Sequence, residues 1–180
     1  MKIHPEISSK HIEWIAAQQM FFVGSAPLSG EGHVNVSPKG GDSFRVLGPR
    51  QVAYLDYTGS GAETTAHLRE NGRIVIMFCA FEGPPQTLRL HGHGTSYQHG
   101  SEAYERLAKH FPENPGSRSI IEVNVTRIAD SCGYSVPNYD FKSQRESLNK
   151  WAAKKGPEGI AAYQEKHNQQ SIDELPAIDS

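Results

Sequence analysis

Residues 56–68 read DYTGSGAETTAHL and mark the point where a strand gives way to a helix. The strand is predicted at Gln51–Tyr57, an apolar run bounded by polar residues. Ser60 stands three residues before Glu63, which is the spacing of a capping box at a helix start. Asn71-Gly72 then supplies a helix stop. The stretch therefore predicts a strand, a flexible turn and a helix of about ten residues.

The start of this helix has the properties of a phosphate site. Free backbone N–H groups and the positive end of the helix dipole favour an anion there. Hydroxyl side chains surround the same point, at Thr58, Ser60, Thr64 and Thr65. A well-capped surface helix that binds nothing is the alternative, because a capping box serves the helix itself. On this stretch alone, both interpretations stay open.

The composition excludes several classes of partner. At 180 residues the chain suits one domain with a substantial core. A net charge of -2 gives no reason to expect nucleic acid or an anionic membrane surface. Met1–Gln18 lacks the continuous apolar core of a secretory signal. The longest apolar run, Ile74–Phe81, is too short to span a bilayer.

The cysteines indicate a reducing compartment. Cys79 and Cys132 form neither a CxxC pair nor a disulfide framework. We therefore expect a cytoplasmic protein. Cys132 is a candidate thiol nucleophile, but its activation requires an electropositive setting. No G-x-S-x-G elbow is present, and no catalytic residue is identified.

The strand pattern predicts a small antiparallel barrel. About six strands with short hairpin turns, interrupted by two or three helices, favour this architecture over a parallel doubly wound sheet. Ile74–Phe81 is continuously apolar, as in a central strand covered on both faces. The other predicted strands include His33–Ser37, Thr87–Gly94 and Ile120–Ile128. Helices are predicted at residues 8–19, with Ile12 and Ile15 on the buried face, and at Ser101–His110.

The chain changes character at Pro137. Helices are predicted at Phe141–Ala152 and Pro157–Lys166, separated by Lys155-Gly156-Pro157, and residues 171–180 are expected to be extended. We therefore divide the chain into a barrel domain, residues 1–136, and a helical C-terminal extension, residues 137–180. The extension is expected to pack on the barrel or on a partner subunit.

Two basic residues are candidates for the counter-charge of a phosphate. Lys39 lies in the turn signal Pro38-Lys39-Gly40-Gly41-Asp42, a predicted break that frees backbone amides. Arg89 lies on the polar face of the strand Thr87–Gly94, and its guanidinium suits bidentate contact with phosphate. A solvated turn lysine and an exposed strand arginine are the alternatives.

A metal site is not expected. His91-Gly92-His93 places two imidazoles on one face of a strand, and His99 follows. A zinc site normally needs three or four ligands. No HExxH motif, CxxC motif or carboxylate-rich partner accompanies these histidines, so a polar strand face explains them.

Three segments in order resemble the pyridoxamine 5'-phosphate oxidase-like flavin-binding proteins. They are Asn35-Val36-Ser37-Pro38-Lys39-Gly40, then Tyr54 to Gly61 with Thr64, Thr65, His67 and Leu68, then Leu88-Arg89-Leu90-His91-Gly92. The resemblance covers roughly residues 10 to 135, the size of a single domain. It implies a split β-barrel that binds FMN, usually as a homodimer with the two flavins in grooves between the subunits.

The resemblance also implies a set of binding residues. These are Ser37, Pro38, Lys39 and Gly40 along the isoalloxazine, Tyr57, Thr58, Ser60, Gly61, Thr64 and Thr65 around the ribityl chain and phosphate, and Arg89 from the neighbouring strand. The segment Cys132–Pro137 is expected to close over the flavin of either subunit.

The chain departs from the vitamin-forming oxidase in two places. That enzyme has an Arg-Lys pair at the helix start, where this chain has Glu63-Thr64-Thr65, and it ends in a strand carrying substrate-binding Arg and His. We therefore expect an FMN-dependent oxidoreductase acting on an unidentified small molecule. The alternative is a non-catalytic barrel that binds a flavin, a deazaflavin or haem, with His91 or His93 as an iron ligand.

Overall fold

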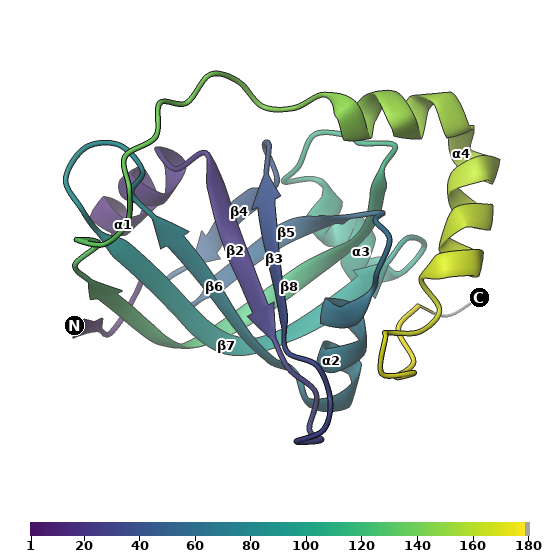
Figure 1. The fold of residues 1–180 in the computed structure, drawn as a ribbon, viewed down its shortest axis with the longest axis horizontal. Coiled ribbons are helices and arrows are strands. Elements are labelled where there is room, and N and C mark those ends of the chain that lie inside the picture. The colour runs from purple at the N-terminus through teal and green to yellow at the C-terminus, as the bar shows by residue number, and fades with distance from the viewer. Residues whose placement is uncertain (179–180) are drawn as a thin grey trace.

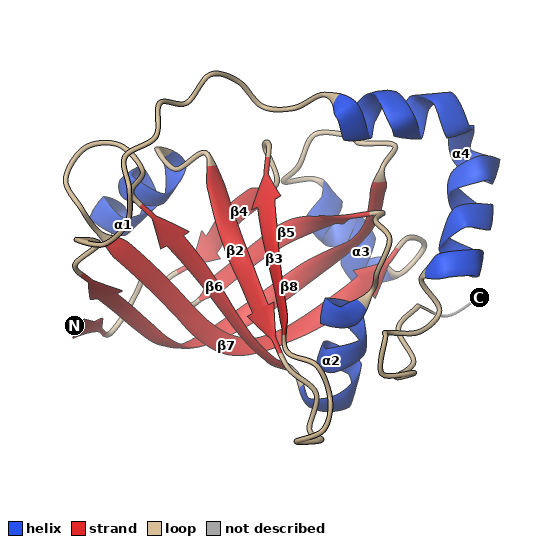
Figure 2. Ribbon diagram, viewed as in Figure 1, coloured by secondary structure: helices blue, strands red, loops and turns tan. Residues whose placement is uncertain are grey.

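A computed structural model describes residues 1–178 and shows one antiparallel sheet with helices around it (Figure 1). The strand order is β3-β2-β6-β7-β8-β5-β4, and β1 pairs with β8. Within the described residues, β3 and β4 are the two ends of this order, so the curved sheet forms a half-barrel that stays open between them (Figure 2). The predicted fold class is confirmed, with eight strands in place of about six.

The strands and helices have the following bounds. The strands are β1 (Lys2–His4), β2 (Met20–Ser25), β3 (Asn35–Gly40), β4 (Phe44–Gly48), β5 (Gln51–Tyr57), β6 (Arg73–Cys79), β7 (Thr87–Gln98) and β8 (Ser117–Ser131). The helices are α1 (Ser9–Ala16), α2 (Glu63–Asn71), α3 (Glu102–Ala108) and α4 (Ser147–His167). None of these helices is long and apolar enough to cross a membrane.

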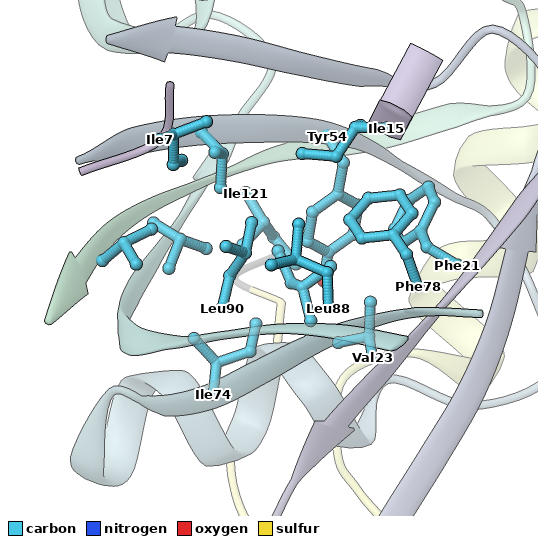
Figure 3. Close-up of a cluster of buried hydrophobic side chains, with 14 of the residues drawn as sticks. Ile7, Ile15, Phe21, Val23, Tyr54, Ile74, Phe78, Leu88, Leu90 and Ile121 are labelled. Carbon is cyan, nitrogen blue, oxygen red and sulfur yellow. The ribbon is translucent and has the colours of Figure 1, made fainter. Parts of the chain in front are cut away.

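The core fills the concave face of the sheet (Figure 3). In β6, Ile74, Ile76 and Phe78 are buried, whereas Val75 and Met77 are only partly covered. The predicted central strand is therefore confirmed, but only one of its two faces is fully buried. One face of β6 lies in the core, and the other remains half open on the outside of the barrel.

The start of α2 differs from the prediction. Its N-cap is Ala62, no side chain caps the helix, and Ser60 lies outside it. The turn before the helix is fixed through its carbonyl oxygens instead, because Asn168 donates to Gly59 and Arg118 donates to Gly61. The capping box at Ser60 is therefore wrong, whereas the predicted stop is confirmed.

The stop depends on backbone conformation. Gly72 ends α2 with φ of 72° and ψ of -8°, a left-handed conformation that glycine adopts without a Cβ penalty. Its N–H donates to the Leu68 carbonyl at 3.0 Å. The chain is thereby turned directly into β6.

Two other helix starts are capped by serine side chains. Ser8 caps α1 in a capping box with His11, and Ser101 caps α3. The predicted inner face of α1 is partly wrong, because Ile12 is 44% exposed and His11 is buried together with Ile15.

The C-terminal extension contains two helical segments that meet at a break within α4, as predicted. Residues 141–146 are not helical, and α4 is broken at Gly156, whose φ is 67° and ψ is 173°. The preceding coil lies against the barrel, where Tyr139 stacks on Phe81. The chain beyond α4 makes turns and one isolated bridge, Gln170 to Pro176, and is not simply extended. Residues 179–180 of the predicted extended segment lie outside the described residues.

The longest strand pair, β7 with β8, bends at a bulge between His91 and Gly92. Replacing Gly92 by alanine is expected to lower the free energy of unfolding by about 1–3 kcal/mol. The new Cβ would collide with the backbone carbonyl of Asn124. Urea unfolding followed by circular dichroism measures the effect.

The matched control is Gly30→Ala, because a Cβ at Gly30 meets no atom within 4 Å. We expect the stability of this variant to stay within about 1 kcal/mol of the parent protein. Equal stability of both variants would contradict a tight backbone approach at the bulge.

Candidate functional site

A hollow of about 430 Å³ lies between β3, the end of β5 and the start of α2. It brings together most of the predicted binding residues, namely Ser37, Pro38, Lys39, Tyr57, Ser60, Gly61 and Thr64. Its remaining lining comes from Asn35, Asp56, Gly59, Glu63, Arg118 and Ile172. The predicted residues Gly40, Thr58, Thr65 and Arg89 are not part of this lining.

Strand β3 supplies one wall of the hollow. The sequence predicted a break at Pro38-Lys39-Gly40, but β3 runs through these residues and pairs with β2. Pro38 is tolerated because β3 is an edge strand, where a missing N–H can face away from the ladder. Lys39 lies opposite the buried Phe21, so its side chain points inward, toward the hollow.

The deepest polar group of the hollow is the carboxylate of Asp56, which is 1% exposed. Lys39 Nζ donates to Asp56 Oδ1 at 2.9 Å, and Arg118 donates to Oδ2 from Nε at 2.9 Å and from Nη2 at 2.6 Å. Burial alone would raise the pKa of Asp56, but the charges and hydrogen bonds of Lys39 and Arg118 outweigh it and lower the pKa to about 2. The carboxylate is therefore ionised, and the three side chains carry one net positive charge.

Arg118 is the main residue that sequence reasoning missed. It precedes the predicted strand Ile120–Ile128, whereas β8 begins at Ser117. The β5–β8 register sets Asp56 opposite Ser119 and Tyr57 opposite Ser117, which brings Arg118 beside the carboxylate. A longer predicted strand would have included Arg118, because β8 begins at Ser117. No local sequence pattern indicated that β8 pairs with β5.

The first turn of α2 faces the same hollow. Its backbone N–H groups have no carbonyl partner within the helix, as at every helix start. Thr64 Oγ1 accepts a hydrogen bond from Asn35 Nδ2 at 3.0 Å, which ties the helix start to β3. Glu63 is the first residue of the helix, and its carboxylate folds back against Gly61. This negative charge offsets the net positive charge of the Asp56 cluster.

Tyr57 lines the hollow, and its hydroxyl lies near Gly41. Burial raises the pKa of Tyr57, and the nearby Asp42 carboxylate raises it further. The phenol therefore remains protonated and available as a hydrogen-bond donor at neutral pH.

Two predicted hydroxyls have structural partners in place of a ligand. Thr58 is 2% exposed and accepts a hydrogen bond from Gln164 Nε2 at 2.7 Å. Thr65 is also 2% exposed, and its hydroxyl lies 3.5 Å from Ser96 Oγ. Both side chains fix the walls of the hollow without lining it.

The C-terminal segment covers one side of the hollow through Ile172. Hydrogen bonds hold this segment: Asn168 Nδ2 donates to the Gly59 carbonyl at 3.0 Å, Arg69 donates to the Ala177 carbonyl at 2.9 Å, and Asp173 accepts from the His33 backbone at 2.8 Å. Figure 1 shows this yellow segment next to α2. No sequence signal placed it there.

Arg89 lies away from this hollow. Its guanidinium donates to Ser131 Oγ at 3.0 Å, and it faces the outside of the barrel. The strand registers align Arg89 with Met77, Phe22 and Pro38 in one row across β7, β6, β2 and β3. The segment Cys132–Pro137 also lies away from the hollow, because Gly133 packs against Gln86.

The Asp56 cluster yields a stability prediction. Asp56→Asn should lower the free energy of unfolding by about 3–5 kcal/mol, because it leaves the buried Arg118 guanidinium without its counter-charge. The control is Asp42→Asn, which breaks an exposed pair with Arg45 and should cost about 0–1 kcal/mol. Urea unfolding at pH 7 compares the two. Similar losses in both variants would contradict the buried character of the Asp56 pair.

Comparison with known proteins identifies the family. The sequence profile named pyridoxamine 5'-phosphate oxidase matches residues 7–132. A pyridoxamine 5'-phosphate oxidase family protein of Aspergillus flavus, ustO, is 37% identical over 194 residues, covering 98% of this chain and 78% of that protein.

Two crystal structures have a similar fold. A point variant of HupZ from Group A Streptococcus superposes with a TM-score of 0.54 at 22% identity, over 69% of this chain and 99% of that chain. A putative pyridoxamine 5'-phosphate oxidase from Lactobacillus delbrueckii gives a TM-score of 0.54 at 18% identity, over 72% of this chain and 99% of that chain. The profile match and the relative at 37% identity agree with this fold. The chain belongs to the pyridoxamine 5'-phosphate oxidase family.

Proposed function

We propose that the protein is an FMN-dependent oxidoreductase that acts on a small molecule. The observation that carries the proposal is the Lys39–Asp56–Arg118 cluster, which holds two cations beside the N-terminus of α2. A phosphate in the hollow would meet Lys39, Arg118, the hydroxyl of Ser60 and the free N–H groups of the helix start. Bound FMN supplies hydride and electron transfer, whereas the protein supplies binding, orientation and electrostatics.

The dimensions of the hollow favour a mononucleotide. A volume of about 430 Å³ falls in the ordinary range for small-molecule sites. FAD carries a second nucleotide beyond the first phosphate, and that extension needs an open path. Ile172 and the segment held by Asn168 and Asp173 cover one side of the hollow. The C-terminal segment therefore supports FMN over the dinucleotide.

Charge substitutions at the rim test the phosphate assignment. Ser60→Glu adds a negative charge and should weaken FMN binding, whereas Glu63→Gln removes one and should strengthen it. Each change is expected to alter Kd by about 5- to 30-fold, the equivalent of about 1–2 kcal/mol. Quenching of flavin fluorescence on titration into apoprotein measures the affinity.

Glu158→Gln is the matched control for these variants, because Glu158 is exposed on α4 and does not line the hollow. Its FMN affinity should equal that of the parent protein. If Ser60→Glu and Glu63→Gln also bind FMN as the parent protein does, the phosphate lies elsewhere and the assignment is wrong.

Turnover is tested separately from binding. Mass spectrometry of the native protein identifies the cofactor. Photoreduction followed by mixing with oxygen, a quinone or NAD(P)H then distinguishes an oxidoreductase from a passive flavin carrier. A flavin that is bound but exchanges no electrons with any of these would support the non-catalytic alternative.

We further propose that the protein is a homodimer with the flavin grooves between its subunits. Val36, on the edge strand β3 of the open barrel, is 65% exposed, and Val34, just before this strand, is 74% exposed. Exposed apolar residues on an edge strand are a ready site of association. In such a dimer, Arg89 on the outer face of one subunit is available to the groove of the other.

The dimer is tested by light scattering after size exclusion. Val36→Glu should shift the parent dimer toward monomer, because the new charge would be buried in the interface. Ile12→Glu, at a 44% exposed site on α1, is the control and should leave the mass unchanged. A monomeric parent protein would disprove the proposal.

The free thiols support a reducing location. Cys79 is buried, Cys132 is exposed, and neither is paired in a disulfide. We therefore place the protein in the cytoplasm.

A further inference from the structure

A second hollow, of about 450 Å³, lies between β1, α1 and the end of β8. Figure 1 places the N-terminus and α1 at the left of the view, whereas α2 and the C-terminus lie at the right. This second hollow is therefore separate from the proposed flavin site and has its own walls and its own polar groups. The proposed function uses none of them.

Three potential metal ligands meet in this hollow, each from a different element. They are His4 at the end of β1, His11 in the first turn of α1, and Asp130 near the end of β8. One ligand atom from each residue lies within 4.8 Å of the other two. His4 Nε2 and Asp130 Oδ2 are 2.9 Å apart, and the β1–β8 register fixes their elements side by side.

We propose that His4, His11 and Asp130 bind a divalent transition-metal ion such as Zn²⁺. Two imidazoles and one carboxylate are a ligand set that catalytic zinc and non-haem iron sites use, with further positions left open. Zinc bonds of about 2.0–2.1 Å place neighbouring ligand atoms about 3.4 Å apart in a tetrahedron. In the structure the ligand atoms lie within 4.8 Å of one another, so metal binding would require side-chain rotations that bring them closer.

The helix cap orients His11 for this role. His11 Nδ1 lies 3.0 Å from the Ser8 backbone N and 3.1 Å from Ser8 Oγ. When Nε2 binds a metal, Nδ1 carries the proton and needs an acceptor, as ligating histidines generally have. Ser8 Oγ is that acceptor. Metal binding at Nε2 would break the Ser8 N–H bond to Nδ1, which is the side-chain half of the capping box, and would leave the bond from the His11 backbone N–H to Ser8 Oγ as the cap.

The charged residues around the cluster influence which ligand would occupy the open coordination position of the metal. Lys2 and Lys10 line the same hollow and are exposed. Their positive charges lower the affinity for a free cation and favour an anionic or hydroxide ligand on the bound metal. The alternative to a metal site is an ion pair between His4 and Asp130 that only fastens β1 to the barrel.

Metal binding by the protein without an affinity tag distinguishes a metal site from a simple ion pair between His4 and Asp130. Isothermal titration with Zn²⁺ is expected to show one ion bound per chain, and Co²⁺ should give the visible absorption of an ordered low-symmetry site. His11→Gln and Asp130→Asn should each weaken Zn²⁺ binding by at least about tenfold, and Ser8→Ala should weaken it less. Zn²⁺ should also raise the Tm of the parent protein, because it binds the folded state.

The control is His110→Gln, which changes an exposed histidine outside the cluster and should leave Zn²⁺ binding unchanged. Far-UV circular dichroism and flavin content show that each variant is folded. Absence of Zn²⁺ binding to the parent protein, or unchanged binding in both His11→Gln and Asp130→Asn, would overturn the proposal and leave the ion pair as the explanation.

Discussion

The buried carboxylate of Asp56 is the interaction on which the binding end of the barrel depends. An ionised group that is 1% exposed is tolerated only when opposite charges reach it. Lys39 comes from β3, at one end of the strand order, and Asp56 comes from β5, next to the other end. The ion pair therefore joins the two sides of the half-barrel where backbone pairing does not. Side chains, rather than a strand ladder, bridge the two sides of the split.

The ion pair between Lys39 and Asp56 explains why the hollow lies at the split. Two cations are brought to one point beside the helix start, where the carboxylate of Asp56 balances one of them and that of Glu63 offsets the other. A closed ladder would have covered the N–H groups of that helix. The C-terminal segment covers the opening only partly, through Ile172. Stability and binding thus draw on the same charges, and the core itself contributes little to the site.

Local patterns predicted much of the fold. The alternation of Leu88 and Leu90 with Arg89 and the stop at Gly72 depend on neighbouring residues, and the structure confirms both of them. The errors lie where distant residues decide the conformation. The turn before α2 is held by hydrogen bonds from Arg118 and Asn168 to its carbonyl oxygens, and these donors lie 57 and 109 positions further along the chain. The predicted capping box at Ser60 was therefore wrong. Most of the hollow was predictable by resemblance, but Arg118 and Ile172 reach it only through strand register and the path of the C-terminus.

Glu63 distinguishes this site from that of the vitamin-forming oxidase. A carboxylate at the first position of a helix is stabilised by the helix dipole, so Glu63 neutralises the hollow from within. An incoming phosphate competes with that carboxylate for the same helix terminus, and the competition costs binding energy. The cations that compensate it lie on β3 and β8 instead of on the helix. At the proposed phosphate site, affinity would therefore depend on the balance between the Glu63 carboxylate beside Gly61 and the Asp56 cluster.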